Sequence, residues 1–379
     1  MFEYVDLKTH FAKKKIEKKV TINPHFGYSL PQDYRMENVR MGVIGSPGSG
    51  KTQFTLINGD QWDNCSYIDP KGEITDLNIH IKFQGRDIEY KNWKFHNIAG
   101  GDNPVYIKTT DVNWGFVESM LGNTNTANKR DAFFKKLEAI HPQQKVTKEQ
   151  LWSVCQDNKY YEHIWNVVSP LIKDNGTSMR DLLHGKNIIT VGDGLGGTTG
   201  AYYGMIMYSL FHYRRDEFRE QRKLTKRPPT ERFLLVCDEA VEYLRKGMPA
   251  TDIARTFVNI GRSLSFDFAY LTQKYTTAIA PEVRDVANTV FLFKYDASQD
   301  LTNLAENFHV NPKAVSTAIT NLKQREKGDD IPECIMLSNL IKGAPVLDPI
   351  QVLPEYYLEL REPEQWTPLL PPDPQGLMG

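Results

Sequence analysis

The sequence predicts an α/β fold of the P-loop type, in which helices flank a mostly parallel sheet and a small all-α insertion interrupts the core. Three observations predict it. An apolar run, Met41–Ile44, leads into a glycine-rich loop, and a second apolar run, Arg232–Cys237, ends in two acidic residues. Between these runs, over residues 111–174, glycine becomes rarer and apolar residues recur at helical spacing. A strand, a glycine-rich loop and a helix in succession are typical of a P-loop domain.

Residues 1–35 are predicted to form an N-terminal arm ahead of this core. They carry the lysine cluster Lys13–Lys15, followed by Lys18 and Lys19. Such a run is typical of a solvated face, and it also offers charge to a polyanion. The core itself is predicted to comprise residues 36–110 and 175–300.

The glycine-rich loop reads G-x-x-x-x-G-K-T from Gly45 to Thr52. Its glycines let successive backbone N–H groups turn toward phosphates, because no Cβ blocks the approach. Lys51 would place a charge beside the β- and γ-phosphates, and the Thr52 hydroxyl would be a ligand of Mg²⁺. The helix expected to begin near Lys51 would add the positive end of its dipole. The loop therefore predicts a site for ATP and Mg²⁺, whose nucleotide-binding residues are Gly45, Pro47, Gly48, Ser49, Gly50, Lys51 and Thr52.

The acidic pair Asp238–Glu239 follows the second apolar run. Asp238 is expected to hold the Mg²⁺, and Glu239 is expected to polarise the attacking water. Without the glycine-rich loop, the two residues would be interpreted as solvated acids at the end of a buried strand. With it, they predict hydrolysis of ATP more than transfer to a substrate hydroxyl.

Two further candidates follow in the chain. A strand over residues 268–271 ends in Thr272-Gln273, and it is preceded by a helix over 253–261 and then Arg262. If this strand lies beside the P-loop strand, Gln273 can sense the γ-phosphate, and Arg262 can reach the γ-phosphate of a neighbouring subunit as a finger. Each would otherwise be an ordinary surface residue. The predicted catalytic residues are thus Glu239, Lys51, Gln273 and Arg262.

The remaining segments complete the domain plan. Stripes such as Phe133 and Leu137, and again Tyr161 and Ile164, predict the helical insertion over 111–174 as a packed core face. A strand over 187–191, a glycine-rich turn over 192–197, a helix over 202–218 and a basic stretch over 219–232 are expected next. Strand 289–293 closes the core, and residues 301–379 are predicted to be a helical and extended region with a proline-rich tail.

Composition narrows the class of protein. The chain has 379 residues and a formal net charge of −1, which argues against a globally basic nucleic-acid coat but allows a locally basic groove. No run approaches the roughly 18 apolar residues of a membrane span, and the N-terminus has no signal-peptide core. The 4 cysteines have no C-x-x-C spacing. These features predict a cytoplasmic protein.

The ordered set of motifs resembles the FtsK/HerA-like motor ATPases, whose core is RecA/FtsK-like, and among them the type IV coupling proteins of conjugation. The resemblance covers about residues 36–300. It is carried by Gly45–Thr52, by the second-strand block ending in Asp69-Pro70-Lys71-Gly72-Glu73, by Asp102-Asn103-Pro104, and by Leu234–Ala240, Ile260–Ser263 and Leu271–Gln273.

The resemblance implies a homo-oligomeric ring, usually a hexamer, that drives DNA through a central channel without regard to sequence and with strandedness left open. It implies nucleotide and Mg²⁺ binding by Lys51 and Thr52, a Walker B pair in Asp238 and Glu239, a sensor in Gln273 and a trans finger in Arg262. Coupling proteins usually begin with transmembrane helices, and this sequence shows none. A membrane-free coupling protein would need a membrane-anchored secretion-channel partner, and it would meet a relaxase.

Three roles share this chemistry: conjugation, HerA-like translocation and viral genome packaging, the last with a capsid partner and a virion-associated location. The Asp69–Glu73 block favours conjugation. A different class also remains open, namely a P-loop ATPase that assembles or remodels protein, as in secretion ATPases.

Overall fold

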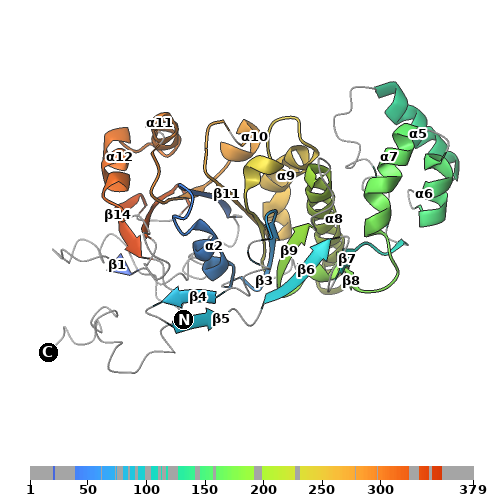
Figure 1. Ribbon diagram of the computed structural model, residues 1–379, viewed down its shortest axis with the longest axis horizontal. Coiled ribbons are helices and arrows are strands. Elements are labelled where there is room, and N and C mark those ends of the chain that lie inside the picture. Colours follow the sequence, from blue (N-terminus) through green and yellow to red (C-terminus); the bar gives the residue numbers. More distant parts are fainter. Residues whose placement is uncertain are drawn as a thin grey trace.

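A computed structural model shows how these segments are arranged (Figure 1). The structure describes residues 20–21, 39–60, 62–72, 74, 80–83, 86–89, 93–98, 104–109, 112, 117, 127–140, 146–156, 159–191, 199–226, 231–277, 279–296, 298–323, 333–340 and 344–351. The proline-rich tail, the turn over 192–197, the residues Asp102 and Asn103, Glu73, and all of the arm except Val20–Thr21 lie outside these ranges.

One large sheet runs through the described part of the chain. Its spatial order is β1 (Val20–Thr21), β14 (Val346–Gln351), β13 (Glu333–Ser338), β12 (Thr289–Leu292), β2 (Arg40–Ile44), β11 (Phe266–Thr272), β10 (Phe233–Cys237), β3 (Asn64–Asp69), β9 (Lys186–Val191), β6 (Trp93–Ile98), β7 (Pro104–Tyr106) and β8 (Thr177–Ser178). The pairs that β13 makes with β12 and β14 are antiparallel, and the other pairs in this sheet are parallel. The predicted mostly parallel sheet is confirmed.

The sheet is covered on both faces, as its buried strands require. Alternate residues of β10 point into different cores: Leu235 lies in the same cluster as Phe211 and Phe257, whereas Val236 lies with Phe54. Phe54 belongs to α2 (Lys51–Asp60), while Phe211 and Phe257 belong to α8 (Thr199–Thr225) and α9 (Pro249–Ile260). The P-loop helix α2 and the helices α8 and α9 therefore pack on opposite faces.

Helices also lie beyond the two ends of the sheet (Figure 1). At the β7 and β8 end are α5 (Ala127–Ile140), α6 (Lys148–Cys155) and α7 (Lys159–Val168), the helices predicted between the two nucleotide motifs. Their buried residues include Phe133, Leu137, Tyr161 and Ile164, as expected from the stripes. Toward the other end are α11 (Ser298–Asn307) and α12 (Pro312–Thr320), and α10 (Pro281–Arg284) follows the β11 loop.

The structure departs from the expected elements in three places. Helix α8 continues to Thr225, beyond the predicted end at residue 218. Strands β13 and β14 follow α12, within the region over 301–379 where helical and extended segments, but no strand of the sheet, were expected. Val20–Thr21, in the predicted arm, pairs with β14 as strand β1. Apart from these three differences, β4 (His80–Phe83) and β5 (Arg86–Glu89) form a hairpin separate from the large sheet.

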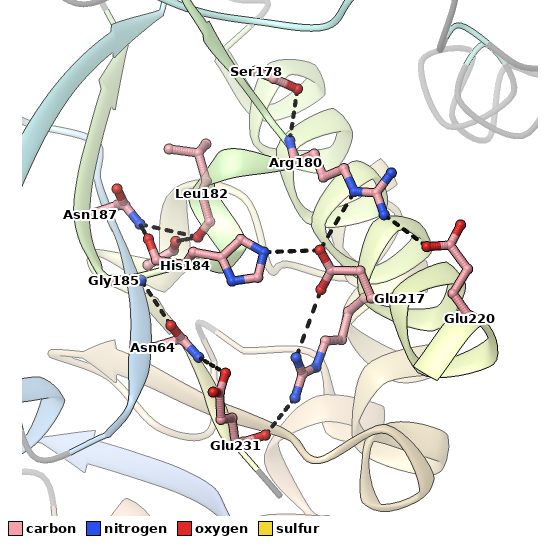
Figure 2. A network of polar contacts seen from close by, with 12 residues as sticks. Asn64, Ser178, Arg180, Leu182, His184, Gly185, Asn187, Glu217, Glu220 and Glu231 are labelled. Carbon is pink, nitrogen blue, oxygen red and sulfur yellow. Dashed lines mark hydrogen bonds and ion pairs between the residues drawn. The ribbon is translucent and has the colours of Figure 1, made fainter. Parts of the chain in front are cut away.

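A polar network joins α8 to the amino ends of the strands (Figure 2). Glu217 of α8 lies between Arg180, 3.6 Å from its carboxylate, and His184, whose Nε2 is 3.0 Å from Oε1. Asn64, at the start of β3, accepts a hydrogen bond from Gly185 N at 2.8 Å. These contacts fix the amino edge of the sheet against the helix that covers it.

Asp267 forms a second, more buried network at the same edge. Its carboxylate is 0% exposed and accepts hydrogen bonds from Val39 N at 2.6 Å and from Trp62 Nε1 at 2.8 Å. Arg232 adds a two-pronged ion pair, with Nε and Nη2 at 2.7 and 2.6 Å. Asp267 thus links the residue before β2, a residue between α2 and β3, and the residue before β10.

We expect Asp267→Asn to destabilise the fold by about 3 kcal/mol, because it leaves buried donors unsatisfied and Arg232 without its counter-charge. The free energy of unfolding from chemical denaturation measures this loss. The same substitution at the exposed Asp131 of α5 is the control and should change stability by less than about 0.5 kcal/mol. Equal effects at the two positions would contradict this role for Asp267.

Candidate functional site

Four parallel strands end at one edge of the sheet and bring the predicted site residues together. Ile44, the last residue of β2, pairs with Thr272 of β11, and Cys237, the last residue of β10, pairs with Ile68 of β3. The residues that follow these strands therefore meet at the carboxyl edge, where open α/β sheets bind their ligands.

The glycine-rich loop is held between β11 and the segment after β12. Gly45 N donates to Thr272 O at 3.3 Å, and Ser46 N donates to Lys294 O at 2.9 Å. Gly48 and Gly50 have φ angles of 70° and 97°, which favour glycine. A Cβ on Gly45 would lie 2.6 Å from the Phe293 Cβ, so glycine is required there. Pro47 and Gly48 form the exposed tip of the loop, while Ser49 is buried.

Lys51 begins α2, as predicted, and its side chain is folded under the loop. Its Nζ donates to Gly45 O at 2.8 Å and to Ser46 O at 3.0 Å. Burial lowers the pKa of Lys51, while the charges of Asp238 and Glu239 act in the opposite direction. The ammonium lies beneath backbone N–H groups at a helix start, an arrangement that favours an anion.

Asp238 follows β10 and is the centre of the metal-binding candidates. Its Oδ2 accepts a hydrogen bond from the Tyr67 hydroxyl at 2.5 Å and one from Thr52 Oγ1 at 3.2 Å, and its Oδ1 accepts one from Glu239 N at 2.7 Å. Burial raises the pKa of Asp238, although these hydrogen bonds lower it. A carboxylate and a hydroxyl within hydrogen-bond distance fit Mg²⁺, which takes hard oxygen ligands from one or two side chains together with substrate phosphates.

The residues described here contain no group of three or more His, Cys, Asp or Glu side chains that could hold a metal by themselves. A Mg²⁺ ion held by Thr52 and Asp238 would accordingly take its remaining ligands from phosphate oxygens and water.

Glu239 has a left-handed backbone, with φ 42° and ψ 44°. A 3₁₀ turn over Ala240–Glu242 follows, and Glu242 N donates to Glu239 O at 2.8 Å. Its side chain is held from two sides: Lys71 Nζ is 2.6 Å from Oε1, and Gln273 Nε2 donates to the same oxygen at 3.1 Å. A left-handed backbone at a residue other than glycine is strained, and such strain persists only where the surrounding structure enforces it.

The structure thus gathers Lys51, Thr52, Asp238, Glu239 and Gln273 into one cluster. Arg262 is not part of it. It lies in the 3₁₀ turn Gly261–Leu264 that precedes β11, at the amino edge of the same sheet.

Two residues join the cluster that the motifs did not single out, Tyr67 and Lys71. Both belong to the block at the end of β3, which was noted only for its resemblance. No local signal in the sequence identifies them, because their contacts depend on β3 lying beside β10.

No protein-family model and no curated protein matches this chain. Solved structures do. VirB4 of Thermoanaerobacter pseudethanolicus aligns with a TM-score of 0.55 and 15% identity over 87% of this chain and 92% of that chain. The bacterial conjugative coupling protein TrwBΔN70 aligns with a TM-score of 0.54 and 12% identity over 90% of this chain and 91% of that chain.

These alignments show that the chain shares the fold of the two proteins, so the predicted fold class is confirmed and the resemblance to coupling proteins is confirmed at the level of the fold. In the part of the chain that the structure describes, no helix has the length and apolar character of a membrane span.

We expect Asp238→Asn to stabilise the protein in the absence of nucleotide, and the gain to grow with pH. The pKa of Asp238 is raised in the folded state, so the wild type loses stability as the pH rises through that value and the buried carboxyl ionises. Asparagine cannot ionise, and the neighbouring hydroxyls can accept as well as donate.

Chemical denaturation at pH 5 and pH 8 measures the difference, with Asp131→Asn as the exposed control. A difference in stability that is the same at both pH values would contradict a strained carboxylate at Asp238.

Proposed function

We propose that this chain is an ATP-hydrolysing ring motor that translocates DNA, most like a conjugative coupling protein, with HerA-like translocation and viral genome packaging as related roles. The observation that carries the proposal is the meeting of Lys51, Thr52, Asp238, Glu239 and Gln273 at the carboxyl edge of a parallel sheet. This set has the residue types that hydrolysis of a nucleoside triphosphate requires.

Each side chain has a distinct role in this proposal. Lys51 and the N–H groups of the loop neutralise the β- and γ-phosphates, and Thr52 and Asp238 hold Mg²⁺, which would polarise the phosphate oxygens when bound. Glu239 accepts the proton of the attacking water. Gln273 donates a hydrogen bond to Glu239 from the end of β11, so a γ-phosphate at this site would act on both side chains.

The DNA part of the proposal rests on the motif resemblance and on the end of α8. Arg222, Lys223 and Lys226 are exposed there, beyond the last turn that packs on the sheet. The basic stretch expected over residues 219–232 is not uniform, because Arg232 is bound to Asp267. The coupling-protein fold of TrwBΔN70 agrees with this role.

The ring part of the proposal concerns Arg262. In its own subunit the residue lies at the end of β11 away from Glu239, so a contact with a γ-phosphate requires a neighbouring subunit. A homo-oligomer, with ATP at the subunit interfaces, would supply that neighbour.

We expect Lys51→Ala to abolish ATP hydrolysis and weaken nucleotide binding, because it removes the charge that faces the phosphates. Glu239→Gln should bind ATP yet lose turnover by at least about 100-fold, since the base is removed while Asp238 remains. Steady-state hydrolysis and binding of a fluorescent nucleotide measure the two effects. Lys173→Ala, a change at an exposed lysine outside the cluster, is the control. Normal turnover in Lys51→Ala or Glu239→Gln would refute the site.

We expect DNA to stimulate hydrolysis by the wild type, and its binding to weaken steeply with salt regardless of sequence. Neutralising Arg222, Lys223 and Lys226 together should reduce the stimulation and the salt slope while basal turnover remains. Hydrolysis with and without DNA at several salt concentrations measures both. If the wild type hydrolyses ATP but neither binds DNA nor responds to it, the DNA translocase proposal fails and a protein-remodelling ATPase takes its place.

A further inference from the structure

One oxygen of the Glu239 carboxylate accepts hydrogen bonds from two side chains. Oε1 accepts from Lys71 Nζ at 2.6 Å and from Gln273 Nε2 at 3.1 Å. A carboxylate oxygen has two lone-pair positions, so these two donors fill them. A water molecule that is to give its proton to Oε1 must first displace one donor.

The loop after β3 positions Lys71 beside Glu239. Asp69 is 2% exposed, and its two carboxylate oxygens accept from Lys71 N at 3.2 Å and from Ile74 N at 2.8 Å. Gly72, with φ 68°, allows the turn between them. The backbone of Lys71 is therefore fixed at the carboxyl edge, while its side chain, 47% exposed, extends to Glu239.

We infer that Lys71 is a positioning residue for which Glu239 and the γ-phosphate of ATP compete. Without a γ-phosphate, with the site empty or holding ADP, the ammonium stays on Glu239 and keeps Oε1 occupied. When ATP binds, the added negative charge draws the ammonium away, and Oε1 becomes free for the attacking water. This inference rests on the proposed function, and it adds a control by which Oε1 is released only when there is a γ-phosphate to cleave.

The charges around the site favour this exchange over a static ion pair. Lys71 is close enough to Lys51 to act on it as a like charge. Two ammonium groups that repel each other favour a polyanion that neutralises both. The flexible stem of a lysine lets its charge move without moving the loop. The ion pair between Lys71 and Glu239 is partly exposed, so it contributes little to the stability of the fold. Stabilisation of the fold alone therefore does not account for the pair.

The first test compares the affinities of ADP and of a non-hydrolysable ATP analogue, both with Mg²⁺. Lys71→Ala should weaken binding of the analogue by about tenfold, as expected for loss of a charge-assisted contact, and leave ADP binding unchanged. It should also lower kcat, and Lys71→Arg should restore part of both losses. Lys274→Ala removes a charge from an exposed lysine at the same edge and should behave as the wild type. Equal losses for the two nucleotides, or the same effect in Lys274→Ala, would overturn the inference.

The second test is a double-mutant cycle on binding of the ATP analogue. Glu239→Gln should tighten binding in either background, because it removes a negative charge near the γ-phosphate. In the presence of Lys71 the gain should be about fivefold larger than in the Lys71→Ala background, because the lysine is also released. Equal gains in the two backgrounds would overturn the competition.

The outcomes separate this inference from the proposed function. If the wild type hydrolyses ATP and Lys71→Ala behaves identically to it, only the role of Lys71 fails. If the wild type does not hydrolyse ATP, the proposed function fails and the inference fails with it.

Discussion

The register of the parallel strands β2, β11, β10 and β3 determines which side chains can meet. Ile44 is opposite Thr272, and Cys237 is opposite Ile68, so the four strands end at nearly the same level. The candidate site residues follow the last paired residues of these strands. Their side chains no longer have to alternate between the two faces of the sheet. A slip of one residue in β10 would exchange its two faces and turn the side chain of Asp238 away from Thr52. The site is therefore a consequence of sheet geometry as much as of its motifs.

The two edges of this sheet use charge in different ways. At the amino edge, Asp267 and Glu217 are held by several donors each, and nothing in these networks needs to change. At the carboxyl edge, Asp238 is buried with a raised pKa, and Glu239 is held in a left-handed backbone. Such features reduce stability, and the packing of the rest of the sheet must compensate for them. The charged groups that stabilise the fold thus lie at the amino edge, and the candidate catalytic groups lie at the carboxyl edge.

The sequence was sufficient for the features that depend on local chemistry. The glycine-rich loop, the acidic pair and Gln273 could be located because each requires particular residue types at the end of a strand. The contacts of Tyr67 and Lys71 could not be located from the sequence, since they depend on β3 lying beside β10. A local sequence pattern does not determine the order of strands in a sheet. The last turns of α8 were missed for a different reason: residues 219–225 are exposed there and show no apolar period, although most of them are good helix formers. Strand β13 was missed because a short apolar run does not reveal its partners.

The fixed surroundings of the β11 loop determine what a movement of Gln273 can do. The next residues, Tyr275 and Thr276, donate their backbone N–H groups to Asp300 at the start of α11, at 2.9 and 3.1 Å. Burial acts to raise the pKa of Asp300, but the hydrogen bonds from this loop and from Tyr295 outweigh it and lower the value. The carboxylate therefore stays charged and holds the loop firmly. Gln273 contacts Glu239 at one end of this short segment and α11 restrains the other, so a backbone shift that reached Tyr275 would have to move α11 or break these bonds. The hydrogen bonds to Asp300 thus hold the backbone that follows Gln273 against the start of α11.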